Sequence, residues 1–257
     1  MRTPPRKLVQ QLSTMGTFPA DAVITDLIAQ GNAAEPDLLG VAADLKLFAK
    51  PAPQCWAPVH ALRVLEQIQP SPAIIAPLLA QHPYTDAYTN ESALMAWNND
   101  LAHTLGMTGA AGLPLLQAAA ADLRHHVQAR GTALVAMAVL ATRVPELHNP
   151  VEADLRHHFA HETDPVLLAF VIYTLCLLRV DELYQPILRA YREKRVHTAF
   201  FTAADARKLV LAKHPSEFLA PRTFWDRYDE DDYGEDLDAE MDLLPDPLQI
   251  PQLGRSI

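Results

Sequence analysis

Two short amphipathic segments joined by a turn, at residues 56–79, limit most strongly how this chain can fold. In the first segment, apolar residues recur every three positions from Val59 to Ile68, which places them on one face of a helix. The other side is lined by polar residues, namely His60, Arg63 and Gln67. The pattern predicts an amphipathic helix with one buried face.

The second segment begins with residues that favour a helix start. Ser71 can cap the helix and Pro72 suits its first position. An apolar stripe follows, formed by Ile74, Ile75, Leu78 and Leu79. Because neither helix can bury its stripe alone, the pair needs neighbours of the same kind, and we predict an all-α fold.

A proline followed by two aliphatic residues marks this second helix and recurs along the chain. The signature falls at Pro77, Pro114 and Pro186, with gaps of 37 and 72 residues. Since 72 is close to twice 37, we expect one unit without the signature between the last two. A period near 36 is typical of solenoids, in which helix pairs stack on their neighbours. We therefore predict an α-solenoid.

Helix-start and helix-stop residues divide the rest of the chain. Residues 1–50 are expected to form lead-in helices, at 4–15, 19–30 and from Pro36 to Pro51. Residues 51–215 are expected to form the helix pairs, with predicted caps at Asp122, Asn149, Asp164 and Thr202. Residues 216–257 are expected to form a largely irregular acidic tail.

The apolar spacing from Ala61 to Leu79 resembles that of the HEAT-like repeat. The order of features is also similar to an uncharacterised bacterial family of HEAT-like domain proteins, many of which end in a SEC-C zinc motif. Three features carry this likeness: residues 17–23, the helix pair that begins at His60, and Arg130 at the opening of an apolar helix. The resemblance implies a right-handed α-solenoid of HEAT-like helix pairs. The chain lacks the Cys-rich terminus of that family, so no zinc module is implied here.

The formal net charge of −10 is concentrated near the C-terminus. Eleven acidic residues lie between Asp226 and Asp246, and the basic residues after position 225 are Arg227 and Arg255. Subtracting these from the totals of 31 acidic and 21 basic residues leaves 20 and 19, so residues 1–225 have a net charge of −1. The tail therefore carries the acidity.

Three features predict a cytoplasmic protein without membrane contact. The longest apolar run, residues 165–178, would be about 21 Å long as a helix, whereas the hydrocarbon core of a bilayer is about 30 Å thick. Residues 1–7 are not followed by the apolar core of a signal peptide. Cys55 and Cys176 form no C-x-x-C motif, so we expect buried thiols in a reducing compartment.

Histidines on one predicted helix suggest a metal site. His157 and His161 would share a helix face, with His158 and Glu162 beside them, but no H-E-x-x-H motif occurs. HEAT-like folds include deoxyhypusine hydroxylase, whose di-iron centre needs several His-Glu pairs, and one such pair is present here. We predict no cofactor and keep a metal-dependent enzyme on a HEAT-like scaffold as an alternative.

A run of basic residues is the candidate for nucleic-acid binding. It consists of Arg189, Arg192, Lys194, Arg195, Arg207 and Lys208. HEAT-like folds also include DNA glycosylases, which need a basic groove for phosphate contacts. The near-neutral body supplies no obvious groove. The second hypothesis is therefore a nucleic-acid-related role, either direct binding through this local patch or regulation by an acidic tail that mimics nucleic-acid charge and covers it.

Two polar features near helices have a structural and a functional interpretation. Asn98, Asn99, Asp100 and His103 lie beside Trp97 and could line a ligand pocket, but we favour a helix surface with one buried Trp. The hexapeptide Ala-Asp-Leu-Arg-His-His occurs at 121–126 and at 153–158. We favour coincidence on two polar helix faces over a paired binding site.

The acidic tail alternates carboxylates with large apolar residues, a composition typical of segments that fold on a partner. Its partner-binding candidates are Trp225, Tyr228, Asp229, Glu230, Asp231, Asp232, Tyr233, Leu237, Met241, Leu243 and Leu244. No nucleotide-binding or hydrolase motif occurs, and we predict no catalytic residues. The sequence thus predicts a non-catalytic protein-interaction scaffold with the tail as a docking or regulatory segment.

Overall fold

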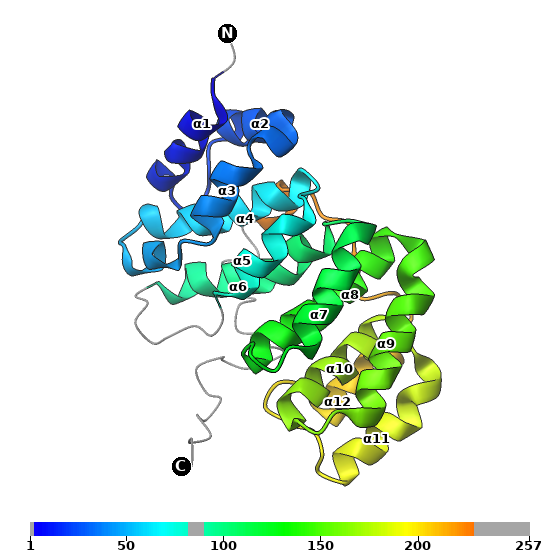
Figure 1. The fold of residues 1–257 in the computed structure, drawn as a ribbon. Helices are drawn as coiled ribbons and strands as arrows, with labels where there is room; N and C mark the ends of the chain where they lie inside the picture. Colours follow the sequence, from blue (N-terminus) through cyan, green and yellow to red (C-terminus); the bar gives the residue numbers. More distant parts are fainter. Residues whose placement is uncertain (1–2, 82–89, 229–257) are drawn as a thin grey trace. The chain divides into compact units, whose positions relative to one another are not determined.

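The computed structural model describes residues 3–81 and 90–228, and every regular element within them is helical (Figure 1). The predicted all-α class is confirmed, with no strand in these two ranges. The chain forms two compact units, residues 1–153 and 154–257. The division lies inside one helix, α9, whereas the boundaries predicted at 50 and 215 follow the composition of the sequence.

The twelve α-helices of the described residues are, in the first unit, α1 (Pro5–Gln11), α2 (Asp21–Gln30), α3 (Glu35–Ala42), α4 (Ala57–Gln67), α5 (Ile75–Leu79), α6 (Glu91–Gly106), α7 (Leu113–Ala121) and α8 (Val127–Arg143). Across the division lies α9 (His148–His161). In the second unit they are α10 (Pro165–Leu177), α11 (Tyr184–Arg192) and α12 (Ala203–Val210). None of these helices is long and apolar enough to cross a membrane.

A long helix, a 3-10 turn and a second helix follow one another four times. The four turns are Pro72–Ile74, Ala110–Gly112, Pro145–Leu147 and Asp181–Leu183, between α4 and α5, α6 and α7, α8 and α9, and α10 and α11. Each second helix has a proline in its first turn, at Pro77, Pro114, Pro150 and Pro186. The first turn tolerates proline because its backbone N–H groups have no partner within the helix.

Pro150 belongs to the helix pair that lacks the sequence signature of a proline followed by two aliphatic residues. It lies 36 residues after Pro114 and 36 before Pro186, but Val151 and Glu152 follow it in place of two aliphatic residues. The fourth residue of every second helix is nevertheless aliphatic and fully buried: Leu78, Leu116, Val151 and Ile187. The expected intervening helix pair is therefore present at residues 127–161.

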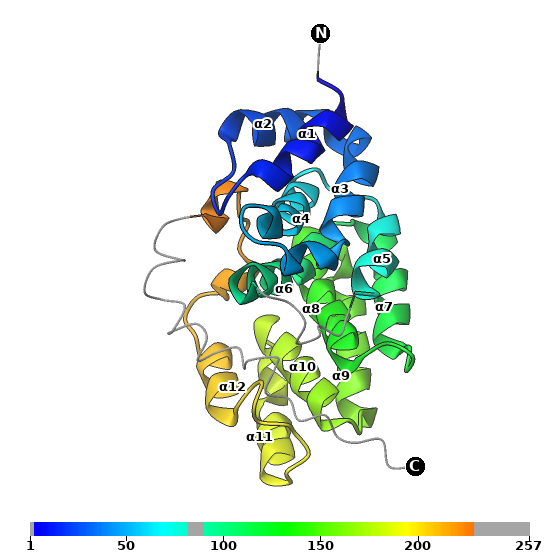
Figure 2. The same ribbon diagram turned by 90° about the vertical axis from the view of Figure 1, so that its left-hand side faces the viewer.

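In the first unit, the helices pack in two layers (Figure 2). α4 contacts α3 and α6, and α6 contacts α8, while α5 contacts α7, which covers α8. Residues 57–66 of α4 are all buried, because neighbouring helices cover it on several sides. α6 and α8 approach closely at Gly106, where an added Cβ would lie 2.6 Å from Val139 Cβ.

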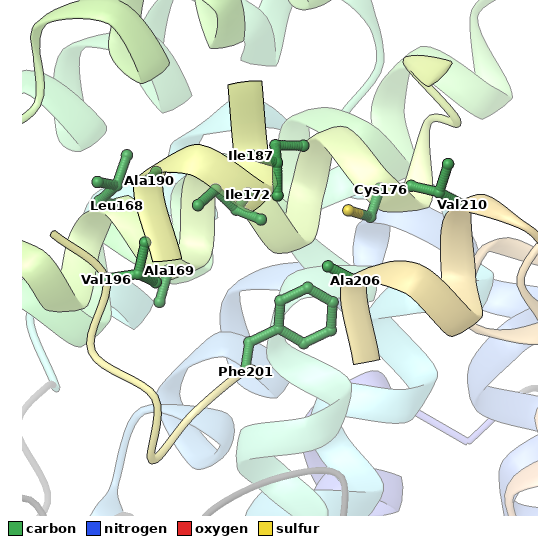
Figure 3. Close-up of a cluster of buried hydrophobic side chains, with 10 residues drawn as sticks. All are labelled: Leu168, Ala169, Ile172, Cys176, Ile187, Ala190, Val196, Phe201, Ala206 and Val210. Carbon is green, nitrogen blue, oxygen red and sulfur yellow. The ribbon is translucent and has the colours of Figure 1, made fainter. Parts of the chain in front are cut away.

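The second unit has a core shared by α10, α11, α12 and the segment before α12 (Figure 3). Ile172 and Cys176 of α10 belong to the same buried cluster as Ile187 of α11. Phe201, which precedes α12, and Ala206 of α12 complete this part of the cluster. Cys176 and Cys55 are both buried and free, as predicted. Burial raises the pKa of the Cys176 thiol to about 12.

Helix caps confirm two sequence predictions and correct three. Asp164 accepts hydrogen bonds from Val166 N at 2.8 Å and Leu167 N at 3.1 Å, and Thr202 forms a capping box with Asp205. Three predicted caps are wrong. Ser71 makes no cap bond because its hydroxyl donates to Glu35, Asp122 ends α7, and Asn149 lies inside α9, which begins at His148.

Candidate functional site

Helices α4 and α6 each contribute three buried polar residues to what we call the α4–α6 polar cluster. On α4, His60, Arg63 and Glu66 are 0%, 4% and 3% exposed, although His60 and Arg63 belong to the polar side of its amphipathic pattern. On α6 they are Asp100, His103 and Thr104, all at most 2% exposed. These six polar side chains are therefore buried, although other polar residues of α6, such as Asn99, are exposed.

An ion pair between Arg63 and Asp100 joins the two helices. Arg63 Nε donates to Asp100 Oδ2 at 2.6 Å, and the side chains are 5% and 3% exposed. Two opposite charges removed from water must be paired, because an isolated buried charge is strongly unfavourable. The pair therefore fixes the register of α4 against α6.

His60 is held by a backbone group far away in the sequence. Its Nε2 lies 2.8 Å from the carbonyl oxygen of Gly16, and because a carbonyl only accepts, Nε2 carries the hydrogen. Burial lowers the pKa of His60 to about 4, and the nearby Arg63 charge acts in the same direction. The imidazole is therefore neutral at pH 7.

Two further bonds position α6. Trp97 Nε1 donates to Ala42 O at 2.9 Å, and the Thr104 hydroxyl lies 3.3 Å from Leu62 O. Trp97 is the buried tryptophan that the sequence predicted. One residue on, both polar atoms of the Asn98 amide are buried without a hydrogen-bond partner, which is an unfavourable arrangement.

The chemistry open to the cluster is narrow. A general base at neutral pH needs a pKa near 7, whereas His60 titrates near pH 4 and Asp100 is fixed by Arg63. The arrangement therefore suits a structural role. The ligand pocket considered at Asn98–His103 would have to include side chains that already hold α4 and α6 together.

Comparison with known proteins gives no identity. No protein-family model matches the chain, and no curated protein and no solved structure is similar to it.

The metal candidates lie together on α9. The rings of His157 and His161 have their centroids 4.3 Å apart, and His161 Nδ1 donates to His157 O at 2.8 Å. Within residues 3–81 and 90–228, no group of three or more His, Cys, Asp or Glu side chains is placed to hold a metal ion. The pair thus offers two ligands, where a structural zinc site normally has four.

All six residues of the basic run are exposed, on α11, on α12 and between them. α11 contacts α12, so the run belongs to one region of the second unit. The run was predicted from proximity in the sequence, and the structure adds that all of its members are exposed.

Two of the partner-binding candidates lie among the described residues. Trp225 is 37% exposed, whereas Tyr228 is 5% exposed and packs against Phe224, with ring centroids 5.0 Å apart. The remaining candidates, from Asp229 to Leu244, lie outside the described residues. Because Phe224 and Tyr228 are buried, a deletion that is meant to spare the body must begin after Tyr228.

The two copies of the hexapeptide have different structures. Residues 122–126 form the turn between α7 and α8, with Arg124 bound to Asp122, whereas 153–158 lie within α9, where Arg156 pairs with Glu182. The copies are therefore not structurally equivalent, and the first lies in a turn rather than on the polar helix face that we predicted.

Proposed function

We propose that this chain is a HEAT-like α-solenoid that acts as a non-catalytic scaffold for protein partners in the cytoplasm. The observation that carries the proposal is the fourfold succession of helix, 3-10 turn and helix. The turns begin at residues 72, 110, 145 and 181, so their spacing is 38, 35 and 36 residues. Regular spacing of helix pairs is the sequence and structural mark of solenoid repeats.

The packing within the first unit supports this interpretation. First helices contact first helices, α4 with α6 and α6 with α8, and second helices contact each other, α5 with α7. In a solenoid, each repeat contacts its neighbours in this way. The recurrent buried position, such as Leu78 and Leu116, gives each second helix the same anchor.

The buried polar groups support a binding role over catalysis. Arg63 and Asp100 are used to join two helices, and burial keeps His60 neutral. Solenoids bind by presenting many moderate contacts over an extended surface, which needs no reactive group.

Affinity capture with quantitative mass spectrometry tests the scaffold role. The immobilised full chain is compared with a variant in which Leu115 and Leu123, both exposed, are replaced by Glu, and with a variant that carries Asp231→Asn, Asp232→Asn and Asp236→Asn. We expect a small set of proteins to be retained by the wild-type chain and lost from at least one variant. No reproducible enrichment over bare resin, or time-dependent consumption of a metabolite by the purified chain, would contradict the proposal.

The exposed basic run supports a second candidate, nucleic-acid binding. Phosphate contacts by Lys and Arg make such binding fall steeply with salt. A labelled 20-mer DNA or RNA would bind a chain that ends at Tyr228, and so lacks the acidic segment, at about 50 mM salt and would be released as salt rises to about 200 mM. Absence of binding at low salt rejects this candidate.

A further inference from the structure

The exposed cations of α11, of α12 and of the segment between them lie in one region of the second unit, because α11 contacts α12, and basic residues outnumber acidic ones in this region. We call it the α11–α12 basic face; it consists of Arg189, Arg192, Lys194, Arg195, Arg207 and Lys208, all exposed. Residues 184–213 contain seven basic residues, these six and Lys213, against two acidic ones, Glu193 and Asp205, a net charge of +5. None of the six is ion-paired within the part of the chain that the structure describes.

The core of the second unit fixes where these cations point. Ile187 and Ala190 form the buried side of α11, and Arg189 and Arg192 are exposed on the opposite side. Ala206 buries the corresponding side of α12.

A hydrogen bond adds rigidity between the two helices. The Tyr191 hydroxyl donates to Phe201 O at 2.9 Å, which ties α11 to the segment that enters α12. The Asp205 carboxylate accepts hydrogen bonds from the backbone N and hydroxyl of Thr202 and caps α12, and its charge is already included in the net +5. The backbone of α11 is thus tied to the segment before α12, and the region has a net positive charge.

The same chain contains a segment of opposite charge. Residues 229–246 hold ten acidic and no basic residues. They follow directly on Tyr228 and are long enough to reach the face: eighteen extended residues span about 60 Å, whereas a compact unit of about 100 residues has a radius of gyration of about 13 Å.

We propose that residues 229–246 of this chain bind the α11–α12 basic face and so mask it from external polyanions. Attachment through the chain gives the segment an effective concentration in the millimolar range, so several individually weak ion pairs suffice. The segment also contains apolar residues, and Leu211, 60% exposed, follows Arg207 and Lys208 by one helical turn. One exposed apolar side chain, that of Leu211, therefore lies next to the cations and could contact an apolar residue of the segment. This inference does not depend on the scaffold role.

Carbodiimide coupling of the full-length chain tests the contact, because the reagent joins a carboxylate to a lysine amine that touches it. Lys194 and Lys208 report on the face, and the exposed Lys46 and Lys50 of the first unit are matched controls. We expect products between residues 229–246 and Lys194 or Lys208 to exceed those with the controls at least fivefold. They should disappear at about 1 M salt, where the Debye length is about 3 Å.

Charge reversal and isotope mixing complete the test. R189E/R192E/R207E, which retains both reporter lysines, should reduce the products to the control level, whereas R6E/K7E/K46E should leave them unchanged. In a mixture of ¹⁴N- and ¹⁵N-labelled chains, each cross-linked product should join two residues with the same label, which shows that both belong to one chain. Equal coupling to all four lysines, coupling between chains, or tight binding of the 20-mer to the face of the wild-type chain at physiological salt would overturn the proposal.

Discussion

Arg63 of α4 and Asp100 of α6 form a buried ion pair 37 residues apart in the sequence, with Nε and Oδ2 separated by 2.6 Å. The pair joins two first helices that belong to successive helix pairs. The ion pair thus acts where one helix pair meets the next, and removing it is the most direct perturbation of that junction.

Replacing Asp100 by Asn should destabilise the protein by about 3–5 kcal/mol, because the buried Arg63 guanidinium loses the carboxylate with which it is paired. Urea denaturation followed by circular dichroism measures the change. R63M/D100L should recover part of the loss, since neither charge then remains. D122N, at the exposed Asp122–Arg124 pair, is the control and should have little effect. A D100N midpoint equal to that of the wild type would refute the structural role of the pair.

The lowered pKa of His60 predicts that the protein loses stability in mild acid. Its folded pKa of about 4 lies below the unfolded value near 6.5, so the unfolded chain binds the additional proton between these values. The contribution of His60, about 3 kcal/mol, is therefore complete above pH 6.5 and is lost as pH falls toward 4. H60Q, whose amide can donate to Gly16 at every pH, should flatten this dependence of the melting temperature. H214Q, at an exposed histidine, should not, and an unaltered slope in H60Q argues against His60 as its source.

Gly106→Ala should lower the melting temperature, because the new Cβ would lie 2.6 Å from Val139 Cβ and 3.0 Å from Ala136 O. We expect a net cost of about 1–3 kcal/mol. Differential scanning calorimetry should show partial recovery in G106A/V139A. G40A, in α3 with no atom within 4 Å of the new Cβ, should instead be neutral or stabilising. Equal effects of the two Gly→Ala changes would mean that α6 and α8 do not approach closely.

Asn98→Leu should stabilise the protein, by about 1–3 kcal/mol, since it removes two buried polar atoms that lack partners. The exposed Asn99, changed to Leu, is the control and should shift the melting temperature little. If N98L lowers the melting temperature, the amide is satisfied in solution, and a bound water or ligand becomes the explanation to pursue.

The sequence predicted elements whose signal is local. Proline placement and apolar spacing located the second helices near Pro77, Pro114 and Pro186, and the doubled gap predicted the unit around Pro150. Capping at Asp164 and Thr202 was predicted for the same reason, because a cap depends on residues within one turn.

The burial and the partners of the polar residues could not be predicted, because both depend on groups that are distant in the sequence. His60 and Arg63 occur on the polar side of an amphipathic pattern, which usually faces water. Only the packing of α4 against α6 shows that Asp100 neutralises Arg63, and only the position of Gly16 explains a buried His60. Ser71 was likewise diverted from capping by Glu35, 36 residues away.

The central claim is that four helix pairs are equivalent, each anchored by the fourth residue of its second helix. Hydrogen exchange of the full chain tests it with L78A, L116A, V151A and I187A, and with L115A at an exposed position as control. Each buried variant should speed exchange in its own second helix, and the Leu and Ile truncations should cost about 2–5 kcal/mol, whereas L115A should exchange like the wild type. If V151A leaves the protection of α9 unchanged while the other three variants lose theirs, residues 127–161 are not an equivalent unit and the fourfold account is wrong.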